Sequence, residues 1–218
     1  MFTLESFQKK HEVDTSEVVI RGRRFRFLVP RSLDPFVDHE NVFHDFPLWA
    51  KLWESSLILA DTLAGMSPEE GKRHLEIGAG LGLVSIVAST FGHDLTMTEH
   101  NPDALEFARA NALLNGCPDL TIMDLDWNEP RLVDDYDYIL GSEVAYHERN
   151  FQALLRLFNT SLKPHGEIIL CEGMRKTNVE FFRQMQEHFV IEARKKTLRM
   201  ANGEVPVILA RIRPKACL

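Results

Sequence analysis

A glycine-rich segment between two apolar runs carries the clearest chemical signal of this sequence. Gly78, Gly80 and Gly82 follow the run HLEI and precede the run LVSIVASTF, a pattern that predicts a tight turn between a strand and a helix. Glycines there let the backbone approach a ligand, and the first turn of the helix offers free N–H groups. Leu83 stands where a pyrophosphate-binding turn, G-x-G-x-x-G, needs its third glycine, and Glu76 precedes the turn. A carboxylate at that position suits a ligand with a cationic amino group.

Acidic residues also end the next two predicted strands. Glu99 closes the run DLTMTE, where the acid of a dinucleotide site bridges two ribose hydroxyls. Asp126 and Trp127 follow the run LTIMDL, where an acid can accept from an adenine amino group and an indole can lie on the ring face. Ordinary packing at a strand end is the alternative role for Trp127. S-adenosylmethionine combines the amino acid, the ribose and the adenine, and we predict that it is held by Glu76, Gly78, Gly80, Gly82, Glu99, Asp126 and Trp127.

The fourth predicted strand ends in a segment that could hold an amine. Glu143 and Tyr146 lie three residues apart after the run YDYILGS, so both side chains can turn toward one pocket at the carboxyl edge of the sheet. The carboxylate would accept a hydrogen bond from the amine, and the ring would offer a π-rich wall to a cation. An ionised Glu143 opposes deprotonation of that amine, so we assign it to binding and orienting. The structural alternative is a helix cap by Glu143 and a packed Tyr146.

The elements that must position these residues alternate between strands and helices. The expected strands cover residues 74–77, 94–99, 120–125, 136–143, 166–173 and 205–213, with a further strand near 190–198. The helices between them are expected at 83–91, 104–116, 150–162 and 178–189. This alternation predicts an α/β fold of the Rossmann-like kind, a mostly parallel seven-stranded sheet with helices on both faces.

The residues before this alternation read as an extension of the same domain. We expect a helix or loose arm over 1–16, a hairpin over 17–30 with Gly22 near its turn, a loop over 32–47 and a helix from Leu48 to Gly65. Phe25 and Phe27 should share one face of the hairpin. The prediction is a single domain over residues 1–218, with an N-terminal extension at 1–47 and a core at 48–218.

Composition narrows the classes of partner. The 218 residues carry a net charge of −7, which does not favour nucleic acid as a ligand. The basic clusters at 21–26 and 194–196 alternate with apolar residues and are interpreted as the solvent-exposed faces of strands. Three widely spaced cysteines and nine scattered histidines show no metal-ligand spacing, so we expect no metal. The sequence has no apolar run of about 18 residues and no signal-peptide pattern, so a cytoplasmic protein that does not bind membranes is expected.

At this point four segments carry a resemblance to a known family. LWESSLILADTL (52–63), LEIGAGLGLVSI (75–86), LDWNEP (125–130) and YILGSEVAYHE (138–148) resemble the class I, seven-β-strand methyltransferases, and among them the protein-lysine methyltransferases of methyltransferase family 16. The resemblance implies the strand order 3-2-1-4-5-7-6 with strand seven antiparallel, and a Trp53 that closes over the cofactor. We place Ser142 with the cofactor-binding residues. The family ends strand four with an acid, two residues and a tyrosine, and this chain has Glu143 where many members have Asp.

The resulting hypothesis is a methyltransferase that uses S-adenosylmethionine and methylates a lysine on a protein substrate. A small-molecule or other N-methyltransferase is the alternative within the same reaction class. A nicotinamide-dependent oxidoreductase is disfavoured by Leu83 and Glu76, and a non-catalytic cofactor-binding protein by the intact pair Glu143 and Tyr146. Nucleic-acid methyltransferases of this fold commonly show Asn/Asp-Pro-Pro-aromatic after strand four, a segment that this chain lacks.

Overall fold

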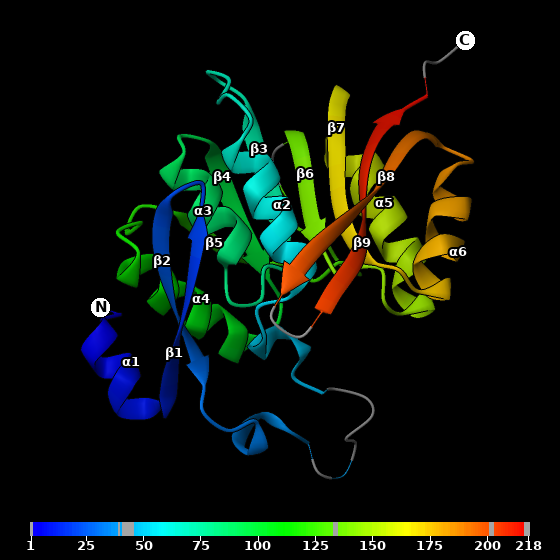
Figure 1. Cartoon of the computed structure of the whole chain (residues 1–218). Helices are drawn as coiled ribbons and strands as arrows, with labels where there is room; N and C mark the ends of the chain where they lie inside the picture. The colour runs from blue at the N-terminus through cyan, green and yellow to red at the C-terminus, as the bar shows by residue number, and fades with distance from the viewer. Residues whose placement is uncertain (1, 39, 41–45, 133–134, 201–202, 216–218) are drawn as a thin grey trace.

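Seven strands form one mixed sheet in the order β5-β4-β3-β6-β7-β9-β8 (Figure 1). The computed structural model describes residues 2–38, 40, 46–132, 135–200 and 203–215. Strands β3 to β7 pair in parallel, whereas β9 is antiparallel to both β7 and β8. The strand order that the family resemblance implied is therefore confirmed. The strands are β3 (Arg73–Ile77), β4 (Asp94–Glu99), β5 (Thr121–Asp124), β6 (Tyr136–Ser142), β7 (Leu162–Gly173), β8 (Phe189–Met200) and β9 (Gly203–Pro214).

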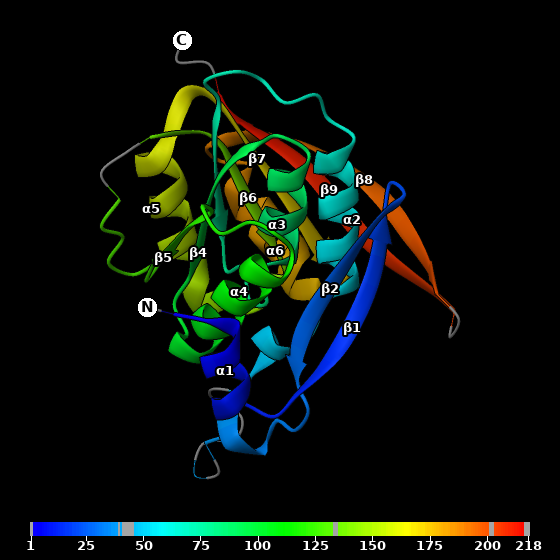
Figure 2. The same cartoon turned by 90° about the vertical axis from the view of Figure 1, so that its left-hand side faces the viewer.

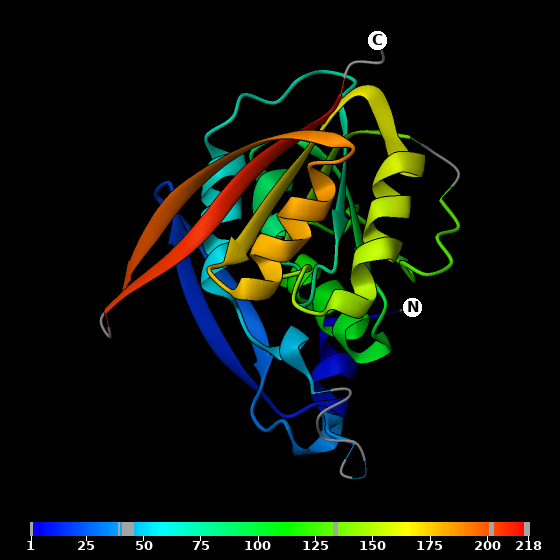
Figure 3. The same ribbon diagram turned by 90° about the vertical axis from the view of Figure 1, so that its right-hand side faces the viewer.

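Helices cover both faces of this sheet, as predicted. On one face lie α2 (Glu54–Ala64), α3 (Leu83–Thr90) and α4 (Pro102–Leu114), and on the other α5 (Phe151–Ser161) and α6 (Lys176–Met185) (Figure 3). The strand side chains alternate to match: Leu140 and Ile169 are buried with the first group, and Ile139 and Ile168 with the second. None of the helices in the described part of the chain is long and apolar enough to cross a membrane.

The segment before α2 differs from its prediction. Leu48–Ala50 forms a single 3₁₀ turn, η2, after Pro47, and the α-helix begins only at Glu54. Trp53 is the N-cap of α2, with extended backbone angles of φ −82° and ψ 149°. An apolar pattern marks the face that a segment buries, and it does not show where the backbone turns into a helix. The predicted loop at 32–47 contains one 3₁₀ turn, η1 (Asp34–Phe36), and falls partly on residues outside the described ranges.

The predicted N-terminal hairpin is confirmed and lies across α2 and α4 (Figure 2). Helix α1 (Leu4–Lys10) precedes β1 (Val13–Ile20) and β2 (Arg23–Pro30), which pair antiparallel. Arg21 and Gly22 form the connection with φ values of 48° and 80°, the left-handed pair that a two-residue hairpin turn requires. Phe25 and Phe27 are both buried against the core, as their shared face predicted.

Two asparagines, one in α4 and one directly after it, hold the hairpin in place by hydrogen bonds. The buried Asn111 accepts a hydrogen bond from Leu28 N at 2.7 Å and donates to the carbonyl oxygens of Leu28 and Leu81 at 3.2 and 3.0 Å. Asn115 exchanges hydrogen bonds of 3.0 and 2.7 Å with the backbone of Arg26. Leu81 belongs to the glycine turn, so one buried amide links the hairpin, α4 and that turn.

Candidate functional site

A cavity of about 990 Å³ lies where the parallel strands end. The turns after β3, β4, β5, β6 and β7 all contribute to its wall, as the carboxyl edge of an open α/β sheet does in other ligand sites. Nine of the eleven residues that the sequence predicted line this cavity: Trp53, Gly78, Gly80, Glu99, Asp126, Trp127, Ser142, Glu143 and Tyr146. Glu76 and Gly82 lie behind its wall.

The glycine turn needs its glycines for backbone shape and for close packing. Gly78, Gly80 and Gly82 have φ values of 61°, 55° and 84°, in the left-handed region that side chains disfavour. A Cβ on Gly78 would come within 3.1 Å of the Trp127 ring, and one on Gly80 within 3.1 Å of the Trp49 carbonyl oxygen. At Gly82 a Cβ would meet the side chain of a buried methionine at 2.8 Å, so this glycine serves packing inside the fold.

Glu76 lies at the end of β3 with only 1% of its surface exposed. Its Oε2 accepts hydrogen bonds from the backbone N of Ser85, at 2.9 Å, and from the Ser85 hydroxyl. Burial raises the pKa of this carboxyl to about 7, although both hydrogen bonds oppose the shift. The carboxyl thus supports the first turn of α3, and contact between Glu76 and a ligand amino group stays a prediction.

Glu99 holds together the two turns that flank it. Its Oε2 accepts from Gly80 N at 2.9 Å, and its Oε1 accepts from the backbone N of His100 and Asn101 at 2.8 and 3.0 Å. A carboxylate has about four lone-pair positions, two on each oxygen, so capacity for a ribose hydroxyl remains on Oε2. The sequence predicted that Glu99 and the glycine turn hold the same cofactor, and in the structure the two are in direct contact.

Asp126 and Trp127 also line the cavity. Asp126 accepts from the backbone N and the side-chain Nδ2 of Asn128 at 2.8 and 3.0 Å. The backbone hydrogen bond is the main reason that the pKa of Asp126 is lowered. The Trp127 ring lies against Gly78, so an aromatic face stands over the glycine turn. The arrangement suits a flat heterocycle with an amino group.

Two tryptophans close the cavity from the segment before α2. The indole Nε1 of Trp53 donates to the carbonyl oxygen of Leu48 at 2.8 Å, and the ammonium of Lys51 lies 4.4 Å from its ring centroid. Amphipathic packing is the alternative role that the sequence offers for Trp49 and Trp53, yet the Trp49 backbone lies against Gly80 and both residues line the cavity. Trp49 lies in the 3₁₀ turn η2, and Trp53 is the extended N-cap residue of α2.

Glu143 begins the loop that follows β6 and forms an ion pair that the sequence did not predict. Its φ is 54°, an uncommon left-handed angle for a residue with a side chain, and its backbone N donates to Cys171 O at 3.1 Å. Its Oε2 lies 2.5 Å from an Nη of Arg175, and the Glu143 side chain is 12% exposed. Tyr146 lies in the same loop and also lines the cavity.

A buried acid behind this loop was also missed. Glu172 in β7 is 0% exposed, and its Oε1 accepts from the backbone N of Val144 and Ala145 at 3.0 and 3.3 Å. Its Oε2 accepts from Nδ2 of Asn178 in α6 at 2.7 Å. Burial, with repulsion from Glu143, raises the pKa of Glu172 to about 8. A charged residue inside the apolar run IILCEG was the available sequence signal for it.

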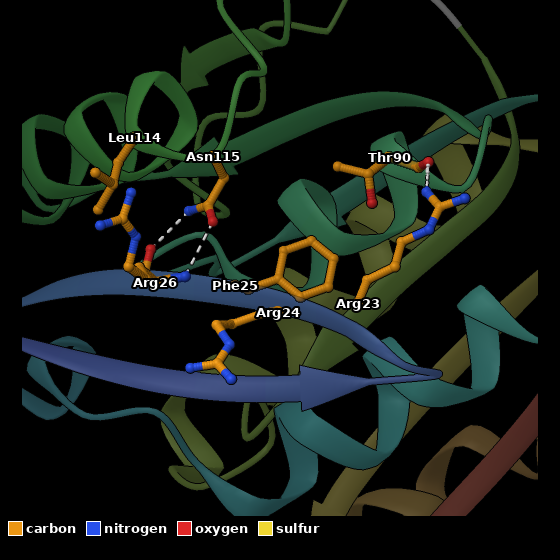
Figure 4. Close-up of a pocket in the computed structure, with 7 residues that line it drawn as sticks. All are labelled: Arg23, Arg24, Phe25, Arg26, Thr90, Leu114 and Asn115. Atoms are coloured by element: carbon orange, nitrogen blue, oxygen red, sulfur yellow. Dashed lines mark hydrogen bonds between the residues drawn. The ribbon is translucent and has the colours of Figure 1, made fainter.

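A second hollow of about 320 Å³ lies away from this edge, between the hairpin and the last turns of α3 and α4 (Figure 4). Arg23 donates to the carbonyl oxygen of Thr90 and stacks on the Phe91 ring at 4.1 Å, while Arg24 pairs with Glu17 at 2.8 Å. Cations at helix C-termini are stabilised by the helix dipole. Arg23 and Arg24 of this basic cluster therefore have structural partners.

Comparisons with known proteins agree with this geometry. A family model described as "Lysine methyltransferase" matches residues 47–188. EEF1A lysine methyltransferase 3 of Mus musculus is 34% identical over 151 residues, which are 66% of this chain and 65% of that protein. Protein N-lysine methyltransferase METTL21A of Danio rerio is 32% identical over 155 residues, which are 66% of this chain and 69% of that protein. The matched region thus spans about two thirds of each curated relative.

Solved structures share the fold at low sequence identity. A ribosomal protein L11 methylase from Lactobacillus delbrueckii has a TM-score of 0.60 at 18% identity, covering 88% of this chain and 95% of its own. Precorrin-6y C5,15-methyltransferase from Geobacter metallireducens has a TM-score of 0.59 at 17% identity, covering 84% and 95%. At such identities the likeness concerns the fold alone.

Proposed function

The chain belongs to the lysine methyltransferase family whose model matches residues 47–188, and on this premise we propose that it methylates a lysine side chain of a protein. The observation that carries the proposal is one cavity lined both by the glycine turn with Glu99 and by Glu143 and Tyr146. The first group of residues suits an adenosyl cofactor and the second suits an amine. Curated relatives with the matching region are named for lysine methylation of proteins.

The residues present fit S-adenosylmethionine. The backbone of Gly78 and Gly80 lines the cavity without a Cβ, at positions where a Cβ would lie 3.1 Å from Trp127 and from the Trp49 carbonyl oxygen. Glu99 would take the ribose, Asp126 and Trp127 the adenine, and Trp53 and Ser142 the remaining wall. When bound, this cofactor supplies a methyl group on a positively charged sulfur, and its product is S-adenosylhomocysteine.

The acceptor wall binds and orients a lysine amine. Glu143 accepts a hydrogen bond from the amine, and the Tyr146 ring supplies a π-rich surface beside it. The site holds the nitrogen about 3 Å from the carbon that it attacks. This proximity and orientation are the main catalytic contribution of such an enzyme. The cavity wall also excludes bulk water from the amine, which favours its neutral form.

Two measurements test this function. S-adenosylmethionine and S-adenosylhomocysteine should bind with micromolar-range affinity and raise the melting temperature, whereas NAD should not. The chain should also transfer radiolabel from the cofactor to a protein in an extract of cells that lack it, and mass spectrometry of that band should find methyl-lysine. Stabilisation by NAD alone would overturn the cofactor assignment. Label found only in small molecules would replace the lysine acceptor by a small-molecule amine.

A further inference from the structure

The ion pair between Glu143 and Arg175 bears on how an amine becomes reactive in this cavity. We propose that Arg175 sets the protonation state of the acceptor, because it neutralises Glu143 and so lets the bound lysine amine lose its proton near neutral pH. Arg175 is then a positioning residue that acts through Glu143. The inference rests on the proposed function and adds to it the residue that reconciles an acidic binding group with a nucleophile that must be neutral.

The pair lies in the wall of the cavity, between two elements. Arg175 is the N-cap of α6, directly after β7, and its backbone N donates to Gly173 O at 3.0 Å. A Cβ on Gly173 would come within 3.2 Å of Glu143 Oε1 and 3.4 Å of Arg175 Cζ, so this glycine leaves room for the pair. The Glu143 side chain is 12% exposed and that of Arg175 44%, which puts the carboxylate deeper than its cation.

The chemical need follows from the pKa of lysine. An unperturbed lysine amine has a pKa of about 10.4, so about one amine in a thousand is neutral near pH 7.4. A carboxylate within about 4–6 Å raises a cation's pKa by about 1–3 units, which would lower the neutral fraction tenfold to a thousandfold further. In methylation the amine lone pair forms the nitrogen–carbon bond as the carbon–sulfur bond breaks, and one proton leaves to water. A lone Glu143 would bind the amine in its unreactive form.

Other ionisable groups surround Glu143, and those of β7 do not supply a cation. From β7, the Glu172 carboxyl faces it and the Cys171 thiol lies nearby, and burial raises the pKa of both. Both groups are therefore neutral at neutral pH or add negative charge. From the same loop come Tyr146 and His147, and the cavity wall also holds Lys51, His100, Arg149 and Arg175. The guanidinium of Arg175 lies 2.5 Å from the Glu143 carboxylate.

A purely structural pair predicts a different result on mutation. If Arg175 only tied α6 to the loop after β6, its loss would lower stability and would reduce the methylation rate by the same factor at every pH. If Arg175 neutralises Glu143, its loss leaves a bare carboxylate beside the amine. The ammonium then binds at least as tightly, and turnover falls because the neutral amine forms only at higher pH.

The experiment compares Arg175→Gln and Arg175→Lys with the wild type from pH 6.5 to 10 at saturating S-adenosylmethionine. The acceptor is an extract of cells lacking this chain, diluted serially so that apparent KM and maximal rate can be separated. Arg183→Gln is the matched control, because Arg183 forms an exposed ion pair with Glu180 on the same helix. Calorimetric titration of the cofactor shows whether each variant is folded at its site.

For Arg175→Gln we expect a rate at pH 7.5 that is lowered about 10- to 100-fold, an alkaline shift of the pH–rate profile of about one unit or more, and a deficit relative to the wild type that narrows toward pH 10. Its apparent KM should stay equal or fall, while Arg175→Lys and Arg183→Gln should keep the wild-type profile. A uniform loss of rate across the pH range, or loss of cofactor binding, would overturn the inference alone. A wild-type chain that transfers no label to protein would overturn the proposed function as well.

Discussion

The two halves of the candidate site are held by different kinds of contact. In the cofactor half, Glu99 receives hydrogen bonds from backbone N–H groups of its own and the neighbouring turn, no more than 19 residues away. In the acceptor half, the loop at Glu143 is held by side chains of Glu172 and Arg175, 27 to 32 residues away. The first half is a property of backbone conformation, and the second is a property of charges that the fold brings together.

This difference predicts which substitutions should weaken cofactor binding and which should slow methyl transfer. Backbone contacts persist when a nearby charge is altered, so the cofactor half should tolerate changes in the acceptor half. Ion pairs and a buried acid respond to any change of charge, so the acceptor half should show its defects in rate and pH dependence. If the two halves were not independent, each of the following changes would impair both cofactor affinity and methylation rate.

Removal of the acceptor carboxylate should have the largest effect. Glu143→Ala should lower the methylation rate at saturating cofactor about 100-fold or more, a loss typical of a preorganised polar group at a reacting centre. Cofactor affinity should stay within about twofold, because the lost contacts belong to the acceptor. Label transfer and calorimetric titration are measured side by side, with Glu180→Ala as an exposed control and Tyr146→Phe as a milder change. Near-full rates in both Glu143→Ala and Tyr146→Phe would remove this loop from the site.

Removal of Glu99 should have the converse signature. Glu99→Ala would lose a charge-assisted hydrogen bond to the ribose, of about 1.5–3 kcal/mol, so S-adenosylmethionine affinity should fall about tenfold or more. Calorimetric titration is the measurement, and circular dichroism should show a folded chain. Asp94→Ala, at the opposite end of β4, should bind the cofactor like the wild type. Unchanged affinity in Glu99→Ala would take this residue out of the site.

A methyl group added to the glycine turn should affect stability and cofactor binding together. Gly80→Ala places a Cβ at φ 55° within 3.1 Å of the Trp49 carbonyl oxygen, whereas Gly71→Ala places one at φ 74° in open space. Both changes should cost about 1–2 kcal/mol of unfolding free energy from left-handed strain. Only Gly80→Ala should also weaken the cofactor, as measured by calorimetry beside urea denaturation. Equal cofactor affinity in the two variants would show that the turn is structural.

The buried acid behind the acceptor loop should make stability depend on pH. In the fold the Glu172 carboxyl keeps its proton up to a pKa of about 8, against an ordinary value of 4.5. Between these values the unfolded chain binds fewer protons, so the unfolding free energy should fall as pH rises, by up to about 1.4 kcal/mol per pH unit. Glu172→Gln cannot ionise and should make that dependence shallower in urea denaturation at pH 5.5, 6.5 and 7.5, leaving the contribution of Glu76, whose pKa is about 7. A slope as steep as in the wild type would show that Glu172 is already ionised in the fold.

What the sequence could predict follows the same division. The sheet, its strand order and the glycine turn depend on local pattern or on a family motif. The sheet and its strand order are confirmed, and the glycine turn lies at the strand end where it was expected. The ion pair of Glu143 with Arg175 joins positions 32 apart, and no spacing rule links them. Glu76 was predicted at the right strand end, but burial turned its carboxyl to Ser85 in α3. Tertiary packing decides such partners, and a single sequence does not record it.

The buried amide of Asn111 has a consequence for the order in which the chain takes shape. The hairpin can pair its own backbone as soon as residue 30 leaves the ribosome, but its fastenings come from residues 83 to 89 positions later. At about 5–20 residues per second, synthesis takes about 4–18 s to deliver them. During that interval the core that buries Phe25 and Phe27 is incomplete, and the nascent hairpin presents an apolar face to chaperones and to other chains.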